Sequence, residues 1–224
     1  MTKREFAALI DHTFLKASGD PDAVDRLCAE ARECRFACAM VNPAEVVRAA
    51  GLLDGSGVRI GTVVGFPLGQ NTVRVKCAEA VEAVQNGASD IDYVLNIRDL
   101  RSRPSDEVLE DLTLMNLAPK KVNDDVVTKL IIECCYLSDE EKTLACRLAK
   151  RAGFDFVKTS TGFGSGGATV HDVELMRKAV GRTMGVKAAG GIRTLDDAMK
   201  MIAAGANRLG CSAGVESLEA FTKG

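Results

Sequence analysis

The chain has 224 residues, enough to bury a large core, and we expect one domain over residues 1–224. Its formal net charge of −2 argues against a nucleic-acid or polyanion binder. No apolar run reaches the roughly 18 residues of a membrane span, and the N-terminal residues lack the apolar core of a signal peptide. These features predict a cytoplasmic protein without a membrane partner.

The eight cysteines are predicted to be reduced. Several of them, such as Cys28, Cys77 and Cys146, lie inside apolar helix or strand patterns, and no C-x-x-C motif is present. The two histidines, His12 and His171, are far apart in the sequence. We therefore interpret the cysteines as core residues and expect no zinc site.

Strand and helix patterns alternate from the first residues. Short apolar or alternating runs predict strands at 8–14, 36–41, 58–66 and 88–96. Between them, Asp20-Pro21 and Asn42-Pro43 are typical helix starts, with an N-cap residue followed by proline at the first helical position. A clear apolar stripe then predicts a helix that is ended by Gly87.

The stretch from residue 97 to residue 128 has the weakest pattern. Val108, Leu112 and Met115 have helical spacing, but Pro119 is expected to interrupt that helix. Beyond it, strands are predicted at 129–135, 154–159, 185–189 and 207–211. Three pairs predict capping boxes for the intervening helices: Ser138 with Glu141, Thr169 with Asp172, and Thr194 with Asp197.

The alternation of eight strands with helices determines the expected fold class. Strands that alternate with helices form parallel arrangements with right-handed crossovers. Eight such units in a chain of this length predict an α/β fold, a single (β/α)8 TIM barrel. A doubly wound open sheet is the alternative.

Lys158 is the first candidate for chemistry. It alternates with Phe154 and Phe156 in the sixth predicted strand, so an amine would share a strand face with two aromatic rings. A charged, unpaired lysine on such a face is costly, and burial lowers its pKa. The resulting neutral amine could attack a carbonyl. The alternative is a lysine that extends to the surface at a strand end.

Further charged residues are predicted to converge on the same end of the barrel, where enzymes of this fold work. Asp92 and Lys187 lie in alternating strands, and Lys129 and Glu133 could share the barrel lumen. Because isolated buried charges are expensive, a cluster of mixed sign is the arrangement that physical chemistry allows. The alternative is an ion-pair network that only stabilises the barrel.

Two glycine-rich loops follow the seventh and eighth predicted strands. They contain Gly190 and Gly191 in the first loop, and Gly210 and Ser212 in the second. Glycines let backbone N–H groups approach an anion, and the loops after strands seven and eight form the usual phosphate site of such barrels. The loops thus favour a phosphate monoester ligand, although tight turns alone would also require glycine.

With these residues identified, the chain resembles the deoxyribose-phosphate aldolases, a family of class I aldolases on a (β/α)8 barrel. The matching motifs run through nearly the whole chain, and they are IDHT (10–13), VVGFPLG (63–69), DIDYVLN (90–96), KLIIE (129–133), FVKTSTGF (156–163), VKAAGGIR (186–193) and RLGCSAGV (208–215). The resemblance implies reversible cleavage of 2-deoxy-D-ribose 5-phosphate to acetaldehyde and D-glyceraldehyde 3-phosphate, without cofactor or metal.

The resemblance also implies roles for individual residues. Lys158 would form the Schiff base, Lys187 would lower its pKa and join the proton relay, and Asp92 would handle protons. The phosphate and substrate contacts would come from Gly162, Gly190, Gly191, Gly210, Ser212 and Lys129. Small phosphosugars and aldehydes are the implied partners, and we take a homodimer as the assembly to be tested.

Two positions depart from the family pattern. Met40 stands where the family usually has cysteine, and Ala213 stands where a serine normally helps to hold phosphate. Two other functions are compatible with the sequence: a different phosphosugar lyase or isomerase, and a barrel that binds phosphosugars without turnover. Imine formation at Lys158 would distinguish the aldolase from both.

Overall fold

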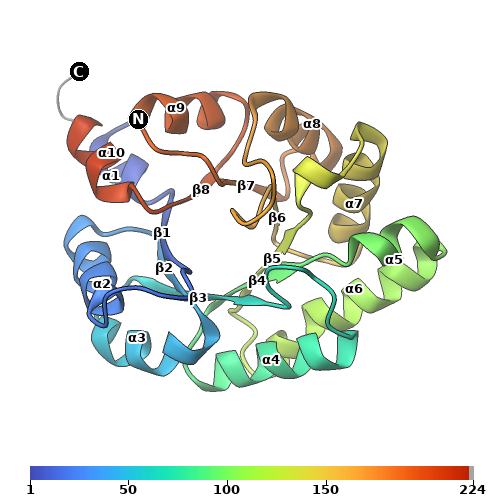
Figure 1. The fold of residues 1–224 in the computed structure, drawn as a ribbon, viewed down its shortest axis with the longest axis horizontal. Helices are drawn as coiled ribbons and strands as arrows, with labels where there is room; N and C mark the ends of the chain where they lie inside the picture. Colours follow the sequence, from blue (N-terminus) through green and yellow to red (C-terminus); the bar gives the residue numbers. More distant parts are fainter. Residues whose placement is uncertain (222–224) are drawn as a thin grey trace.

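A computed structural model describes residues 1–221, within which eight parallel strands close into a barrel in sequence order. The strands are β1 (Ile10–Phe14), β2 (Cys38–Val41), β3 (Arg59–Val64), β4 (Asp90–Val94), β5 (Val127–Ile131), β6 (Phe156–Lys158), β7 (Gly185–Ala189) and β8 (Arg208–Cys211). Helices surround the strands (Figure 1). The barrel prediction is confirmed, and the open-sheet alternative is wrong because β1 pairs with both β2 and β8.

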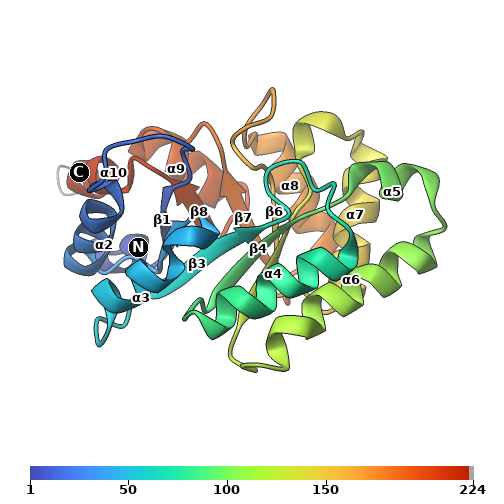
Figure 2. The same cartoon turned by 60° about the horizontal axis from the view of Figure 1, so that its bottom comes forward.

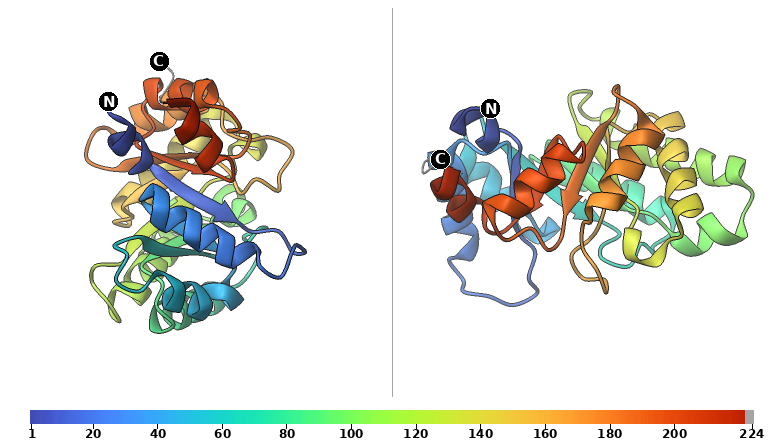
Figure 3. Two further views of the ribbon diagram at one scale, coloured as in Figure 1. Left: turned by 90° about the vertical axis from the view of Figure 1, so that its left-hand side faces the viewer. Right: turned by 90° about the horizontal axis from the view of Figure 1, so that it is seen from above.

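The helical elements are α1 (Lys3–Ala7), α2 (Ala23–Cys34), η1 (Pro43–Glu45), α3 (Val46–Leu53), α4 (Val73–Gln85), α5 (Ile97–Ser102), α6 (Ser105–Lys120), η2 (Cys134–Tyr136), α7 (Asp139–Arg151), α8 (Val170–Val180), α9 (Leu195–Ala203) and α10 (Gly214–Ala220). Helices α1 and α10 lie side by side (Figure 1 and Figure 3), and the rings of Phe6 and Phe221 stack with centroids 5.1 Å apart. Helices α5 and α6 lie across the barrel from them (Figure 2). In the part of the chain that the structure describes, no helix is long and apolar enough to cross a membrane.

The core lies between the strands and the surrounding helices. Buried aliphatic side chains dominate it, and they are joined by the buried cysteines Cys28, Cys38, Cys134, Cys146 and Cys211. All eight cysteines are free thiols. The interpretation of cysteines as core residues therefore holds for five of the eight, while the other three are half-buried.

All strands except β7 are shorter than their sequence patterns predict, and the reasons are clearest for β5 and β6. Strand β5 ends at Ile131 because Glu133 has φ 52°, a left-handed conformation that turns the chain into η2. Strand β6 begins only at Phe156, and the ring of Phe154 packs against Tyr93 at 5.9 Å instead of sharing a face with Lys158. A short buried run does not reveal where extended backbone stops.

Helix starts and stops differ from prediction at three places. Helix α2 begins at Ala23 with Asp22 as its N-cap, two residues after the predicted Asp20. Thr169 caps α8 by accepting from the Asp172 N–H, but the Asp172 carboxylate binds the Thr169 hydroxyl, so the reciprocal half of the box is missing. The other two capping boxes are confirmed.

The third difference is Pro119, which lies inside the last turn of α6 instead of ending the helix. A proline there cannot donate to the carbonyl four residues earlier, that of Met115. The buried hydroxyl of Tyr93 on β4 donates to that carbonyl at 2.7 Å. The helix thus continues to Lys120 because a strand residue supplies the hydrogen bond that proline removes.

Candidate active site

The lumen of the barrel holds a group of opposite charges that we call the lumen cluster: Asp11, Asp90, Asp92, Lys129, Lys158, Lys187 and Arg208. The six aspartate and lysine side chains are buried, and Arg208 is nearly so. Strand register brings these residues together, because Asp92 lies opposite Lys129 and Lys158 lies opposite Lys187 on neighbouring strands. The cluster has the mixed sign that burial of charge requires.

Asp92 is the centre of the cluster. Its Oδ2 accepts hydrogen bonds from the Nζ atoms of Lys158 and Lys187, each at 2.8 Å, and its Oδ1 lies 3.0 Å from Lys129 Nζ. Lys187 also donates to Asp11, which accepts from Arg208 at 2.9 Å. The structure therefore brings Asp92, Lys158 and Lys187 into direct contact.

Lys129 occupies the lumen below this contact. Its Nζ lies 2.5 Å from Asp90, whose other oxygen accepts from Arg59 on β3. Asp90 and Asp92 together make its pKa higher than usual, although burial opposes that shift. Lys129 is thus a buried ammonium whose donors are used within the cluster.

The charges of the cluster give the three central groups different protonation states. Burial lowers the pKa of Lys158 to about 8, with Asp92 opposing this shift and Lys187 and Lys129 contributing to it. Burial would raise the pKa of Asp92, but the three lysines hold it well below its usual range. Burial would lower the pKa of Lys187, but Asp11 and Asp92 raise it. At neutral pH the cluster therefore contains a fixed carboxylate, a fixed ammonium and an amine that titrates.

A cavity of about 480 Å³ opens above Lys158 at the carboxyl ends of the strands. Loops after four strands line it, and its wall includes Gly162, Gly190, Gly191, Gly210 and Ser212. All five glycine and serine positions predicted for phosphate therefore lie on one cavity with Lys158. Lys129 is not among the residues that line it, which separates that residue from the other predicted substrate contacts.

Backbone contacts hold these loops close together. Gly190 and Gly191 have φ values of 85° and 80°, which favour glycine. The Ala168 N–H donates to the Gly190 carbonyl at 2.9 Å, and a Cβ on Gly167 would collide with that oxygen. The Thr159 hydroxyl also donates to the Ala189 carbonyl at 3.0 Å. Glycine is thus needed for close approach as well as for turning.

Glu133 does not share the lumen with Lys129, so that prediction is wrong. Because β5 ends at Ile131, the Glu133 carboxylate instead accepts from the backbone N–H of Thr161 at 3.1 Å and from the Thr161 hydroxyl. Through these two hydrogen bonds Glu133 holds the loop that follows β6 in place. Met40 is buried against Cys38, and Ala213 is not among the residues that line the cavity.

Sequence reasoning missed several charged residues of the site. Asp90 lies two residues before Asp92 on the same strand face, so alternation carried a signal for it. Asp11 and Arg208 were visible only as charged residues in short strands, because cross-strand register is not written in the sequence. Lys16 and Arg193 also line the cavity and add positive charge beside the glycine loops.

This arrangement suits carbonyl chemistry on an anionic substrate. The amine that titrates near neutral pH can form an imine, the adjacent carboxylate and ammonium can exchange protons, and the glycine loops offer N–H groups to an anion. A parallel (β/α)8 barrel with its titrating groups and a cavity at the carboxyl ends of the strands has the layout of the barrel enzymes.

Comparison with known proteins identifies the family. The model of the DeoC/LacD family of aldolases matches residues 6–220, so the chain belongs to that family and is an aldolase, a carbon–carbon lyase. A deoxyribose-phosphate aldolase of Bacteroides thetaiotaomicron is 51% identical over 221 residues, covering 99% of this chain and 92% of that protein. One of Caldanaerobacter subterraneus is 54% identical over 217 residues, covering 97% and 94%.

Solved structures show the same fold. The crystal structure of a protein from Coccidioides immitis that is assigned as a deoxyribose-phosphate aldolase superposes with a TM-score of 0.93 at 41% identity, covering 99% of this chain and 87% of that one. The deoxyribose phosphate aldolase of Aeropyrum pernix, described as a tetramer, superposes with a TM-score of 0.90 at 33% identity. The match covers 99% of this chain and 93% of that one.

Proposed function

We propose that this aldolase reversibly cleaves 2-deoxy-D-ribose 5-phosphate to acetaldehyde and D-glyceraldehyde 3-phosphate through an imine on Lys158. The observation that carries the proposal is the position of Lys158, which lines the cavity while its Nζ donates to Asp92 Oδ2 at 2.8 Å. Burial lowers the pKa of this amine to about 8. The names of the relatives agree with this substrate.

The first step is attack of neutral Lys158 Nζ on the aldehyde carbon, C1, of the open-chain sugar. The carbinolamine that forms must lose water, so its oxygen needs a proton. Lys187, held as an ammonium 2.8 Å from Asp92, is the donor that the contacts favour. Asp92 touches both amines and can pass the proton lost by Lys158 toward Lys187.

The second step breaks the bond between C2 and C3. A base removes the proton of the C3 hydroxyl, C3 becomes the aldehyde of glyceraldehyde 3-phosphate, and the bonding electrons move through C2 into the iminium nitrogen. The resulting enamine takes a proton at C2, and water releases acetaldehyde and regenerates the amine. Asp92 and Lys187 are the proton carriers within reach of Lys158 in this scheme.

The phosphate would be held at the glycine loops. Gly190, Gly191 and Gly210 line the cavity and could offer backbone N–H groups to the phosphate, and Lys16 and Arg193 bring positive charge to the same cavity. Binding energy from the phosphate places C1 against Lys158. We also propose a cytoplasmic location, where the eight free cysteines stay reduced.

Trapping with borohydride tests the proposal. Acetaldehyde and borohydride should fix an ethyl group on Lys158, which peptide mass mapping can locate. Lys158→Arg keeps the charge but cannot form the imine at neutral pH, so turnover should fall to background. Labelling of Lys187 or Lys129 in place of Lys158 would overturn the assignment of the nucleophile.

A further inference from the structure

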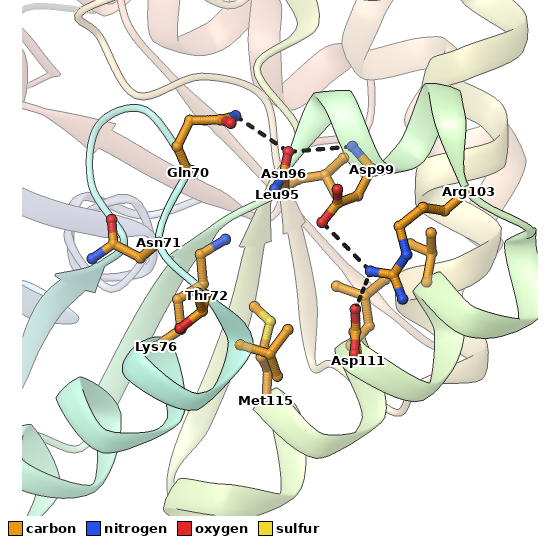
Figure 4. A pocket seen from close by; sticks show the side chains of 13 residues that line it. Gln70, Asn71, Thr72, Lys76, Leu95, Asn96, Asp99, Arg103, Asp111 and Met115 are labelled. Carbon is orange, nitrogen blue, oxygen red and sulfur yellow. Dashed lines mark hydrogen bonds and ion pairs between the residues drawn. The ribbon is translucent and has the colours of Figure 1, made fainter.

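A second cavity, of about 280 Å³, lies outside the barrel between α4, α5 and α6. Its lining includes the apolar side chains of Val108, Leu112 and Met115 as well as polar side chains such as Asn71 and Thr72. Figure 4 shows Lys76 rising from α4 into this space, across from Asp99, Arg103 and Asp111. The proposed aldolase reaction uses none of these residues.

Lys76 is buried, with 2% of its surface exposed. Within residues 1–221, no carboxylate oxygen lies within 4 Å of its Nζ, so it forms no ion pair there. Its Nζ donates to two backbone carbonyls, those of Gly69 and Val94, each at 2.7 Å. A neutral amine has two N–H groups, which these carbonyls satisfy completely. The fourth tetrahedral position on the nitrogen, which holds the lone pair of the neutral amine, has no protein partner among the described residues.

The carboxylates around Lys76 do not neutralise the positive charge that its protonated amine would carry. Burial lowers the pKa of Lys76 to about 8, against weaker opposing effects of Asp99, Glu79 and Asp111. Those three carboxylates are engaged elsewhere: Asp99 and Asp111 with Arg103, and Glu79 with the Gly65 N–H at 3.0 Å. Lys129 and Lys187 are equally buried but are held as ammonium ions by contacting aspartates.

We propose that Lys76 is a second aldehyde-reactive amine, a modification site for small aldehydes that enter the cavity between α4 and α6. In the reaction the nitrogen lone pair attacks the aldehyde carbon, the two N–H protons leave with the carbonyl oxygen as water, and a C=N bond forms. The choice of acetaldehyde as reactant rests on the proposed function, because that reaction releases acetaldehyde. The assignment of Lys76 as nucleophile and of the cavity as its site does not depend on the proposed function.

The modification would also change the structure around it. An imine nitrogen carries no N–H, and its protonated form carries one, so at least one of the two carbonyls loses its donor. Those carbonyls belong to the end of the loop 65–69 and to the last residue of β4. Phe66 of that loop packs edge-on against Phe163, which lines the active cavity, so the adduct would disturb one wall of the active site.

The test is reductive labelling of the Lys158→Arg variant with dilute acetaldehyde and cyanoborohydride, followed by peptide mass mapping. An amine of pKa about 8 is about 9% neutral at pH 7, whereas a freely exposed lysine of ordinary pKa is about 0.04% neutral. At equal access Lys76 should therefore label on the order of 200-fold faster than an exposed lysine at pH 7. Its rate should level off above pH 8 to 9.

Lys187 is the matched internal control, because it is as buried as Lys76 but remains an ammonium, and it should stay unlabelled. Lys76→Arg in the same background should remove the fast label. Labelling of Lys76 no faster than that of Lys187, or only after addition of urea, would overturn the proposal. The outcome is independent of the aldolase assignment, which depends on labelling of Lys158 in the unsubstituted chain.

Discussion

Replacing Lys187 with methionine should make the activity strongly dependent on pH. Lys187 shares Asp92 Oδ2 with Lys158, and its charge lowers the Lys158 pKa. Without it, Asp92 acts on Lys158 with less competition, so the Lys158 pKa must rise. A full return from about 8 to the ordinary value of about 10.4 would reduce the neutral amine at pH 7 on the order of 200-fold.

The actual loss should be smaller, because burial is the largest cause of the low pKa and remains in the variant. A rise to about 9.5 gives a deficit of about 30-fold at pH 7 and about 4-fold at pH 9, since the neutral fraction recovers as the pH increases. The measurement is kcat/KM for 2-deoxyribose 5-phosphate from pH 6.5 to 9.5.

Asp92→Asn is the control for this measurement. Loss of the carboxylate removes a group that raises the Lys158 pKa, so that pKa falls and amine supply is not impaired. The deficit of Asp92→Asn should therefore not shrink as the pH rises, in contrast to that of Lys187→Met. Parallel profiles for the two variants, with no recovery of Lys187→Met by pH 9, would refute tuning of the pKa by Lys187 and leave it a role in proton transfer or positioning.

Further substitutions and conditions test the phosphate site, the helix α6 contact and the buried carboxylates. Gly190→Val should raise KM for the phosphorylated sugar far more than for unphosphorylated deoxyribose, because φ is 85° and the loop approaches Gly167; equal effects would remove the phosphate assignment. Tyr93→Phe should lower the free energy of unfolding by about 1–3 kcal/mol in urea titrations, since the Met115 carbonyl loses its donor, and an unchanged midpoint would contradict this. Asp11 and Asp92 have folded pKa values below the ordinary value of about 3.9, so the stability they contribute is complete above about pH 4 and is lost as the pH falls through their folded pKa values. The urea concentration at the unfolding midpoint should therefore decrease as the pH is lowered from about 4 to about 2. A midpoint that stays constant over that range would exclude a stabilising role for these charges.

Local sequence patterns were sufficient for the barrel and for much of the site. Alternation identified the strands that carry Asp92 and Lys187, and glycine spacing identified the loops around Gly190 and Gly210. These features are local, because strand periodicity and turn chemistry act over a few residues. The family resemblance added Gly162, which the structure places on the same cavity.

Contacts between distant residues were not predictable in the same way. Glu133 was assigned to the lumen because its spacing from Lys129 fits a strand, but a left-handed residue is not visible in that spacing. Pro119 was expected to interrupt a helix that Tyr93, 26 positions earlier in the printed sequence, allows to continue. The partner of a charged strand residue depends on register, which closure of the barrel determines.

The shared carboxylates of the lumen cluster restrict how this site can be re-engineered. Asp90 serves Arg59 and Lys129, while Asp11 serves Lys187 and Arg208. Removal of one member leaves a buried charge without its partner, at a cost of about 3–5 kcal/mol, while joint replacement of an acid and a base by apolar groups is often neutral. A library that randomises Asp90 together with Lys129 should therefore contain a larger fraction of folded variants than libraries that change either position alone. New activities on this barrel are thus more accessible through such double exchanges than through single substitutions.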